Sequence, residues 1–223
     1  MSYTAGRWER LAETGVVAPE PDAYGRRRLD MWAVAVGVLV LVGSAIVVSN
    51  GTVGSFEEDV FHAINDLPDF LEAPMWVLQL VGLLAAPLLF ALFALALGRR
   101  WLGGALMAAV PLKLLLERGV VKVLVERERP GSTISDVTIR GVSAAGLSFP
   151  SGHAVLAFTI AGLVGPYLTR TGRIVIYTIA VLNGLARVYL GAHNPLDIVG
   201  GAALGIALAG ALNLVVGVPL SED

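Results

Sequence analysis

The sequence predicts an all-α, polytopic membrane protein with six transmembrane helices. Of its 223 residues, 56% are hydrophobic and only 15% are charged, and the mean hydropathy is +0.74. A soluble domain carries about 25% charged residues, so this chain is too apolar to be one, and it is far too apolar to be disordered. Its apolar residues form long runs, each close to the ~20 residues that cross a bilayer as a helix.

Six runs are expected to span the membrane. They are Met31–Val48, Met75–Gly98, a third span that begins at Trp101 and is uncharged to about Leu112, Pro150–Leu168, Ile174–Leu190 and Leu196–Val216. Pro87, inside the second run, predicts a kink because proline removes a helical hydrogen bond. Lys113 and Glu117, on the third span beyond its uncharged part, are four positions apart, which favours either a buried ion pair or a role in placing a lipid headgroup.

These runs divide the chain into three parts. Residues 1–30 form a polar cytoplasmic segment without the apolar core of a signal peptide, residues 31–217 the six-helix membrane domain, and residues 218–223 a cytoplasmic tail. Arg99 and Arg100 make the turn between the second and third runs, whereas residues 49–72 hold six acids and no Lys or Arg. The positive-inside rule therefore predicts that both termini are cytoplasmic.

The first outer loop is expected to carry a short interfacial helix. Ser55 and Glu58 match a capping box, which predicts where this helix begins. His62 lies within it and is expected to be a surface residue. The apolar face that would contact the membrane comprises Val60, Phe61 and Ile64.

Composition and small motifs limit the cofactors and partners. The net charge of −2 gives no basic excess for nucleic acid, and the absence of cysteine excludes disulfides and thiolate metal sites. Alternation of acids with arginines favours internal ion pairs over a metal site; the acids are Glu126, Glu128 and Asp136. Small residues spaced by four in the last run favour helix packing within the chain, or a homodimer face; they are Gly201, Gly205 and Ala209.

Polar residues from three separate segments are expected to meet on one side of the membrane. His153 and His193 are 40 residues apart, and two ~20-residue crossings return the chain to the face that it left. The end of the third span brings Lys122 and Arg129 to the same face. Charged groups at span ends need a partner or a function, although each alone is commonly a snorkelling anchor or a polar contact.

The cations of this cluster predict a phosphate site. Lys122, Arg129 and Arg187 would repel one another at one depth unless an anion lies among them, and Arg and Lys both suit phosphate. The segment Pro150–His153 is expected to begin a helix, whose free N–H groups would point at the anion. Gly152 would let the backbone approach a ligand closely.

The two histidines predict acid–base and nucleophilic chemistry. Asn194 and Pro195 have the pattern of an N-cap and first helical residue, which places Asp197 in the first turn, near His193. A carboxylate at one ring nitrogen fixes the tautomer and leaves the other nitrogen free to attack. Beside a cationic site, the two histidines would provide a nucleophile and a general acid.

These residues resemble the motifs of the type-2 phosphatidic acid phosphatase superfamily of membrane lipid phosphatases. The family signature has three parts, and all three occur here in order. They are Lys122-(six residues)-Arg129-Pro130, Pro150-Ser151-Gly152-His153, and Arg187-(five residues)-His193-(three residues)-Asp197. The family usually has Ser before the arginine of the third part, where this chain has Ala186.

The resemblance implies a role for each motif residue. His193 would attack phosphorus to form a phosphohistidine, Asp197 would orient it, and His153 would protonate the leaving oxygen. The phosphate would be held by Lys122, Arg129, Ser151, Gly152 and Arg187, with Arg127 and Pro150 as secondary contacts. No metal or cofactor is expected, because fixed cations stabilise the charge in phosphoryl transfer.

The positive-inside orientation places this site at the outer edge of the bilayer, and that location predicts a lipid substrate. The expected activity is hydrolysis of a lipid phosphate or diphosphate, such as an isoprenyl diphosphate or a diacyl lipid phosphate, at the extracytoplasmic face of a bacterial plasma membrane. The expected partners are the lipid bilayer and this lipid substrate. Two alternatives remain: phosphate transfer from lipid to lipid at the same site, and an anion-binding transporter or scaffold without catalysis.

Overall fold

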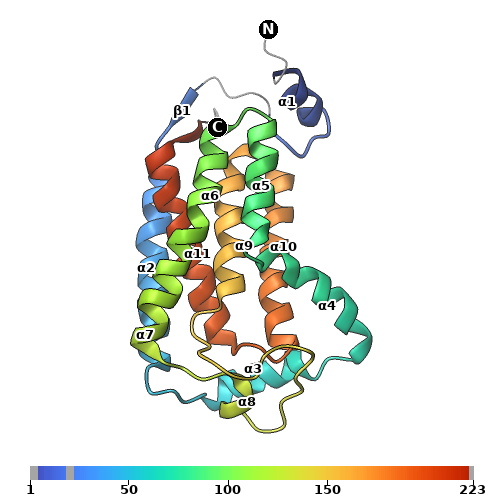
Figure 1. Cartoon of the computed structure of the whole chain (residues 1–223), viewed down its shortest axis with the longest axis vertical. Helices are drawn as coiled ribbons and strands as arrows, with labels where there is room; N and C mark the ends of the chain where they lie inside the picture. Colours follow the sequence, from blue (N-terminus) through green and yellow to red (C-terminus); the bar gives the residue numbers. More distant parts are fainter. Residues whose placement is uncertain (1–4, 19–22, 221–223) are drawn as a thin grey trace.

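The computed structural model of the protein describes residues 5–18 and 23–220. This part of the chain is mostly helical, and its long helices run side by side along one axis (Figure 1). The helices are α1 (Ala5–Ala12), α2 (Arg28–Val48), α3 (Ser55–Asn65), α4 (Glu72–Leu78), α5 (Ala85–Ala96), α6 (Arg100–Leu114), α7 (Lys122–Val125), α8 (Pro130–Thr133), α9 (Gly152–Val164), α10 (Arg170–Tyr189) and α11 (Pro195–Val216). The 3₁₀ turns η1 (Asp69–Leu71), η2 (Gln79–Gly82) and η4 (Gly165–Tyr167), the π-helix η3 (Leu115–Val121), and the strands β1 (Ala23–Gly25) and β2 (Val218–Leu220) complete the described elements.

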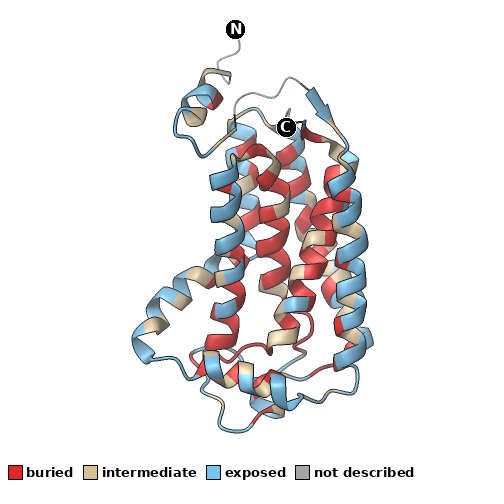
Figure 2. Ribbon diagram, turned by 180° about the vertical axis from the view of Figure 1, so that it is seen from behind, coloured by how far each residue is buried: buried red, intermediate tan, exposed pale blue. Residues whose placement is uncertain are grey.

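The centre of the bundle is α9, which packs against α6, α10 and α11. Most of its side chains are buried, whereas α2 on the outside exposes much of its apolar surface (Figure 2). Close packing depends on the small residues of α11: a Cβ added to Gly201 would lie 2.6 Å from the Ser151 carbonyl oxygen, and one on Gly205 would lie 2.5 Å from that of Val155. The small-residue stripe of α11 therefore packs against α9, within the chain.

Helix length and apolarity alone identify fewer spans than the six expected. Two described helices, α2 and α11, are long and apolar enough to cross a bilayer. The pair Asp69–Gly82 and Ala85–Ala96 would make a third if it is one broken span. The six-span count thus remains a prediction, whereas the helical fold class is confirmed.

The second expected span is bent in the way that Pro87 predicts. Its two halves meet at 62°, with a break between Gly82 and Ala85. A proline cannot donate to the carbonyl four residues earlier and clashes with it, so the regular helix is interrupted just before Pro87. The break matters for function because its residues face the polar cavity described below.

The third expected span continues as a helix beyond its uncharged part. The helical segment runs past Leu112 through η3 and α7 to Val125. Lys113 and Glu117 are both buried, and Lys113 Nζ lies 2.5 Å from Glu117 Oε2 in the ion pair that their spacing favours. The segment stays helical because these charges face the interior and satisfy each other.

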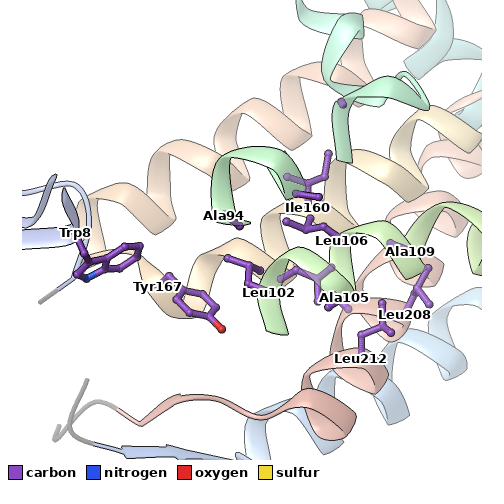
Figure 3. Packing of buried hydrophobic residues seen from close by; sticks show 14 residues of the cluster. Trp8, Ala94, Leu102, Ala105, Leu106, Ala109, Ile160, Tyr167, Leu208 and Leu212 are labelled. Carbon is purple, nitrogen blue, oxygen red and sulfur yellow. The ribbon is translucent and has the colours of Figure 1, made fainter. Parts of the chain in front are cut away.

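Described residues of the two terminal segments make contacts within the fold. Strand β1 pairs antiparallel with β2. Trp8 of α1 is only 4% exposed, and its ring meets Tyr167 edge-on at 6.3 Å (Figure 3). This contact joins α1 to the apolar core formed around α6 and α9.

The first loop does form a helix, α3, but it begins differently from the prediction. Its N-cap is Gly54, and Ser55 is the first helical residue, so the expected Ser55–Glu58 capping box is wrong. Phe61 is fully buried and packs with Val188 of α10. On the outer face of the helix, His62 Nδ1 lies 3.3 Å from Asp66 Oδ2. Helices α3 and α8 lie at the end of the bundle opposite α1 and β1 (Figure 1).

Candidate active site

A cavity of about 810 Å³ opens into the bundle near the end that carries α3 and α8. It is lined by six of the residues that the motifs single out, namely Lys122, Arg129, Gly152, His153, Arg187 and His193. The helix break at Gly82–Ala85 and the polar side chains after α6 complete much of the wall. The structure thus confirms that the three distant segments meet at one place.

His193 lies in the short loop between α10 and α11 and is 2% exposed. Its Nδ1 is 3.6 Å from Asp197 Oδ2 and 3.4 Å from Ser148 Oγ. Since these groups occupy the Nδ1 side of the ring, Nε2 on the other side is left for the cavity. Burial lowers the pKa of His193 to about 4, although the Asp197 carboxylate opposes this shift. The imidazole is therefore neutral near pH 7, the state in which it can act as a nucleophile.

Asp197 is held from several directions. Its Oδ2 accepts hydrogen bonds from the Ser148 hydroxyl and, at 2.8 Å, from the Asn194 backbone N–H. Its Oδ1 accepts from Arg127 Nη1 at 3.0 Å. Asn194 is the N-cap of α11 and Pro195 its first residue, as predicted. A fully buried carboxylate with these donors has a fixed orientation, and it can in turn orient His193.

Arg127 lies behind Asp197 and is completely buried. It forms a two-pronged ion pair with Glu57 of α3, with N···O distances of 3.1 and 2.6 Å. The neighbouring Glu126 is exposed. Arg127 therefore connects α3 to the Asp197–His193 pair, rather than lining the cavity as the sequence-based prediction of a secondary phosphate contact requires.

The three cations that the motifs bring to the cavity are each anchored through part of their hydrogen-bond donors. Lys122 Nζ donates to the Leu147 carbonyl at 2.8 Å, and Arg129 Nη1 donates to the Ser143 and Ala192 carbonyls at 3.0 and 3.3 Å. Arg187 Nη1 donates to Gln79 Oε1. The buried Nε atoms of both arginines have no hydrogen-bond partner among the described residues. Fixed guanidinium groups with unused donors are suited to an oxyanion.

The segment Pro150–His153 forms a helix start, with a shift of two residues from the prediction. Ser151 is the N-cap and Gly152 the first residue of α9, so Pro150 is not the first helical residue but lies buried before it, after a cis peptide bond. The Ser151 N–H donates to the Asp197 carbonyl at 2.9 Å, and its buried hydroxyl has no hydrogen-bond partner among the described residues. This contact joins the α9 and α11 starts around the cavity.

Two glycines leave room for side chains of the cavity wall, Gly82 for His153 and Gly152 for Lys113. A Cβ on Gly82 of η2 would lie 2.5 Å from His153 Cβ, and one on Gly152 would lie 2.8 Å from Lys113 Nζ. At both positions the glycine backbone thus lies closer to a side chain of the cavity than a residue with a Cβ could. Ala186, at the position where the resembled family usually has Ser, is fully buried in α10.

The sequence did not reveal three of the buried polar contributors. Glu57 and Ser148 have no motif spacing to Asp197, and Gln79 lies within an otherwise apolar run. Each reaches the site only through tertiary contacts. A group of three or more His, Cys, Asp or Glu side chains placed to hold a metal ion is not found in residues 5–18 and 23–220.

Fold and site together define a helical membrane protein with a cavity lined by two histidines and several cations. The model of the PAP2 superfamily matches residues 87–218, which is more than half of the chain. The chain belongs to the PAP2 superfamily, and it is an integral membrane protein.

Shorter segments are similar to curated bacterial proteins. Phosphatidylglycerophosphatase B of Bacillus subtilis (strain 168) is 34% identical over 99 residues, which is 40% of this chain and 46% of that protein. Bacitracin transport permease protein BcrC of Bacillus licheniformis is 39% identical over 62 residues, 28% of this chain and 30% of that protein. The matched segments thus span less than half of the length of either relative.

Two solved structures resemble the fold over most of their length. Aquifex aeolicus LpxE superposes with a TM-score of 0.63 and 26% identity, covering 70% of this chain and 93% of that one. The transmembrane PAP2-type phosphatidylglycerolphosphate phosphatase from Bacillus subtilis superposes with a TM-score of 0.62 and 25% identity. The match covers 80% of this chain and 94% of that one.

Proposed function

We propose that the protein hydrolyses a lipid phosphate or diphosphate through a phosphohistidine intermediate. The observation that carries this proposal is the arrangement of His193: a neutral, buried imidazole held by Asp197 on one side, with three cations around the cavity on the other. Phosphoryl transfer needs mainly positioning and charge stabilisation, and this pocket supplies both. The names of the similar phosphatases support the same chemistry.

In this mechanism His193 Nε2 attacks phosphorus while the bond to the leaving oxygen breaks. The electron pair stays on the leaving oxygen, which takes a proton from His153. Lys122, Arg129 and Arg187 stabilise the charge on the phosphoryl oxygens. Water then attacks the phosphohistidine and gives its proton to His153, so that inorganic phosphate leaves and His193 is restored.

The proposed location follows from the ends of the bundle. The cavity lies at the end opposite the Arg99–Arg100 turn, and the positive-inside rule assigns that turn to the cytoplasm. The site would then face outward, with both termini cytoplasmic and six spans between them. A headgroup could enter this cavity while its tails remain in lipid, which favours isoprenyl diphosphates and diacyl lipid phosphates as substrates.

The purified protein should release inorganic phosphate from such lipids, and EDTA should leave the rate unchanged. His193→Ala should lose essentially all turnover because it removes the nucleophile. His62→Ala is the matched control, since His62 lies on the outer face of α3 and pairs with Asp66. Wild-type rates in His193→Ala would refute the nucleophile assignment, whereas equal losses in both variants would indicate a folding effect.

Two other functions use the same cavity and are separated by their products. Transfer to a lipid alcohol would yield a new phospholipid from a labelled phosphate donor instead of free phosphate. An anion transporter is favoured by one observation, the name of the relative called a bacitracin transport permease. Uptake into proteoliposomes without phosphate release would support transport and contradict hydrolysis.

A further inference from the structure

We infer that Lys113 binds a second phosphate group of the substrate, on the leaving-group side of the cavity, so that the site discriminates in favour of diphosphates. This inference rests on the proposed function. It concerns a residue outside the three motifs, and it deepens the proposal by assigning a subsite to one class of lipid substrate.

Lys113 is a buried cation in a helix that otherwise faces apolar surroundings. It is 4% exposed, yet it lines the cavity. Its Nζ lies 2.5 Å from Glu117 Oε2, and Glu117 Oε1 lies 3.2 Å from Lys122 Nζ. One carboxylate thus holds two ammonium groups along the cavity wall. Charged residues inside membrane helices are costly and commonly functional.

The position of Lys113 relative to the two histidines assigns it to the leaving group. A Cβ on Gly152 would lie 2.8 Å from Lys113 Nζ, so this ammonium is adjacent to the residue that precedes His153. In phosphoryl transfer the attacking and leaving oxygens or nitrogens lie roughly in line, on opposite sides of phosphorus. If His193 attacks phosphorus, the leaving oxygen points toward His153. Lys113 then lies beside the rest of the leaving group, which is bonded to that oxygen.

For a diphosphate, the group attached there is a second phosphate. The bond from the terminal phosphorus to the bridging oxygen breaks, and its electron pair becomes additional negative charge on the departing monophosphate. An ammonium beside this group stabilises that charge directly. For a monoester the departing group is an alcohol, which needs the proton of His153 but offers Lys113 no anion.

The charge of the cavity also exceeds the need of a monoester. Among the described residues that line it are five cations, Lys113, Arg118, Lys122, Arg129 and Arg187, and one carboxylate, Glu117. Without the two histidines, these groups carry a net charge of +4, whereas a phosphate monoester carries at most two negative charges. A diphosphate carries a third negative charge and places it on the side where Lys113 lies.

The alternative is that Lys113 and Glu117 form only a structural ion pair. The two cases are separated by Lys113→Met, assayed on farnesyl diphosphate and farnesyl phosphate, which share one tail. The kcat/KM for farnesyl diphosphate divided by that for farnesyl phosphate should fall roughly 10- to 100-fold in Lys113→Met. This is the range expected for losing a charge-assisted hydrogen bond. Lys113→Arg, which restores a cation, should recover most of the ratio.

This ratio is insensitive to partial misfolding, since a smaller active fraction lowers both rates equally. A ratio within about twofold of wild type in Lys113→Met would overturn the inference. Binding of methylenediphosphonate and of inorganic phosphate, measured by calorimetry, gives a second test that requires no turnover. Weakened diphosphonate binding with unchanged phosphate binding supports the subsite, and equal effects refute it. Wild-type protein that binds both anions but hydrolyses neither lipid would contradict only the proposed function.

Discussion

At the scale of single residues, the site depends on a histidine kept neutral by burial and oriented by a charged network. The pKa of His193 is lowered to about 4 because desolvation outweighs the attraction of Asp197. Asp197 is in turn tied to Arg127 and Glu57. The network therefore fixes the imidazole without protonating it, which is the state that nucleophilic attack requires.

The protonation of His193 can be followed by NMR of histidine side-chain nitrogens in detergent. The signal that disappears in His193→Gln should remain that of a neutral ring from pH 7 down to about pH 5, because its pKa lies near 4. Over the same range the unfolded chain takes up the proton first, so this group makes the fold less stable as pH falls below about 6.5. A midpoint near 6.5 would contradict the burial argument.

Glu57 is expected to act as a positioning residue, through Arg127 and Asp197. Glu57→Gln should lower kcat about 10-fold with little change in KM, because the aspartate loses its fixed orientation while the phosphate cations remain. The lost charged hydrogen bond should also cost about 1–3 kcal/mol of unfolding free energy. Glu58→Gln, at the neighbouring and less buried position, is the control. An unchanged kcat in Glu57→Gln would show that the network does not support catalysis.

At the scale of elements, the site is built where regular helices are interrupted. The helix break before Pro87 brings η2 against His153, and the start of α9 brings Gly152 to the cavity. These features follow from local signals, namely proline, glycine and N-cap residues, and so they were predictable to within a few residues. The differences are of this size: α9 begins at Gly152 rather than at Pro150, and the N-cap of α3 is Gly54 rather than Ser55.

Gly82 tests the importance of the break. In Gly82→Ala the new methyl group would lie 2.5 Å from His153 Cβ, so η2 or the histidine must move. We expect a loss of about 1–3 kcal/mol in unfolding free energy and a lower kcat. Gly43→Ala in α2, with nothing within 4 Å of its added Cβ, should instead be neutral or slightly stabilising. Equal behaviour of the two variants in chemical unfolding and turnover would exclude a packing role for Gly82.

At the scale of the whole molecule, two helical crossings return His153 and His193 to one end of the bundle. Span periodicity and charge were sufficient to predict this convergence. They did not predict the network around Asp197, because Ser148 donates to it from the loop before α9 and Glu57 of α3 reaches it only through Arg127. The spacing of Lys113 and Glu117 on the third span did indicate their buried ion pair.

The orientation of the molecule can be tested by cysteine labelling, because the chain contains no cysteine. Ser143→Cys, an exposed position in the loop near Arg129, should react with an impermeant maleimide added to intact cells. Thr171→Cys, exposed at the start of α10, should react only after the cells are opened. The reverse pattern would place the site on the cytoplasmic side.

The central claim, that His193 is the phosphoryl acceptor, is tested most directly by rapid quenching of the enzyme with a lipid substrate labelled at the terminal phosphate. We expect an acid-labile, base-stable label on the protein that maps to His193 and is absent from His193→Ala. Label on any other residue, or turnover by an enzyme that never becomes labelled under single-turnover conditions, would contradict the account.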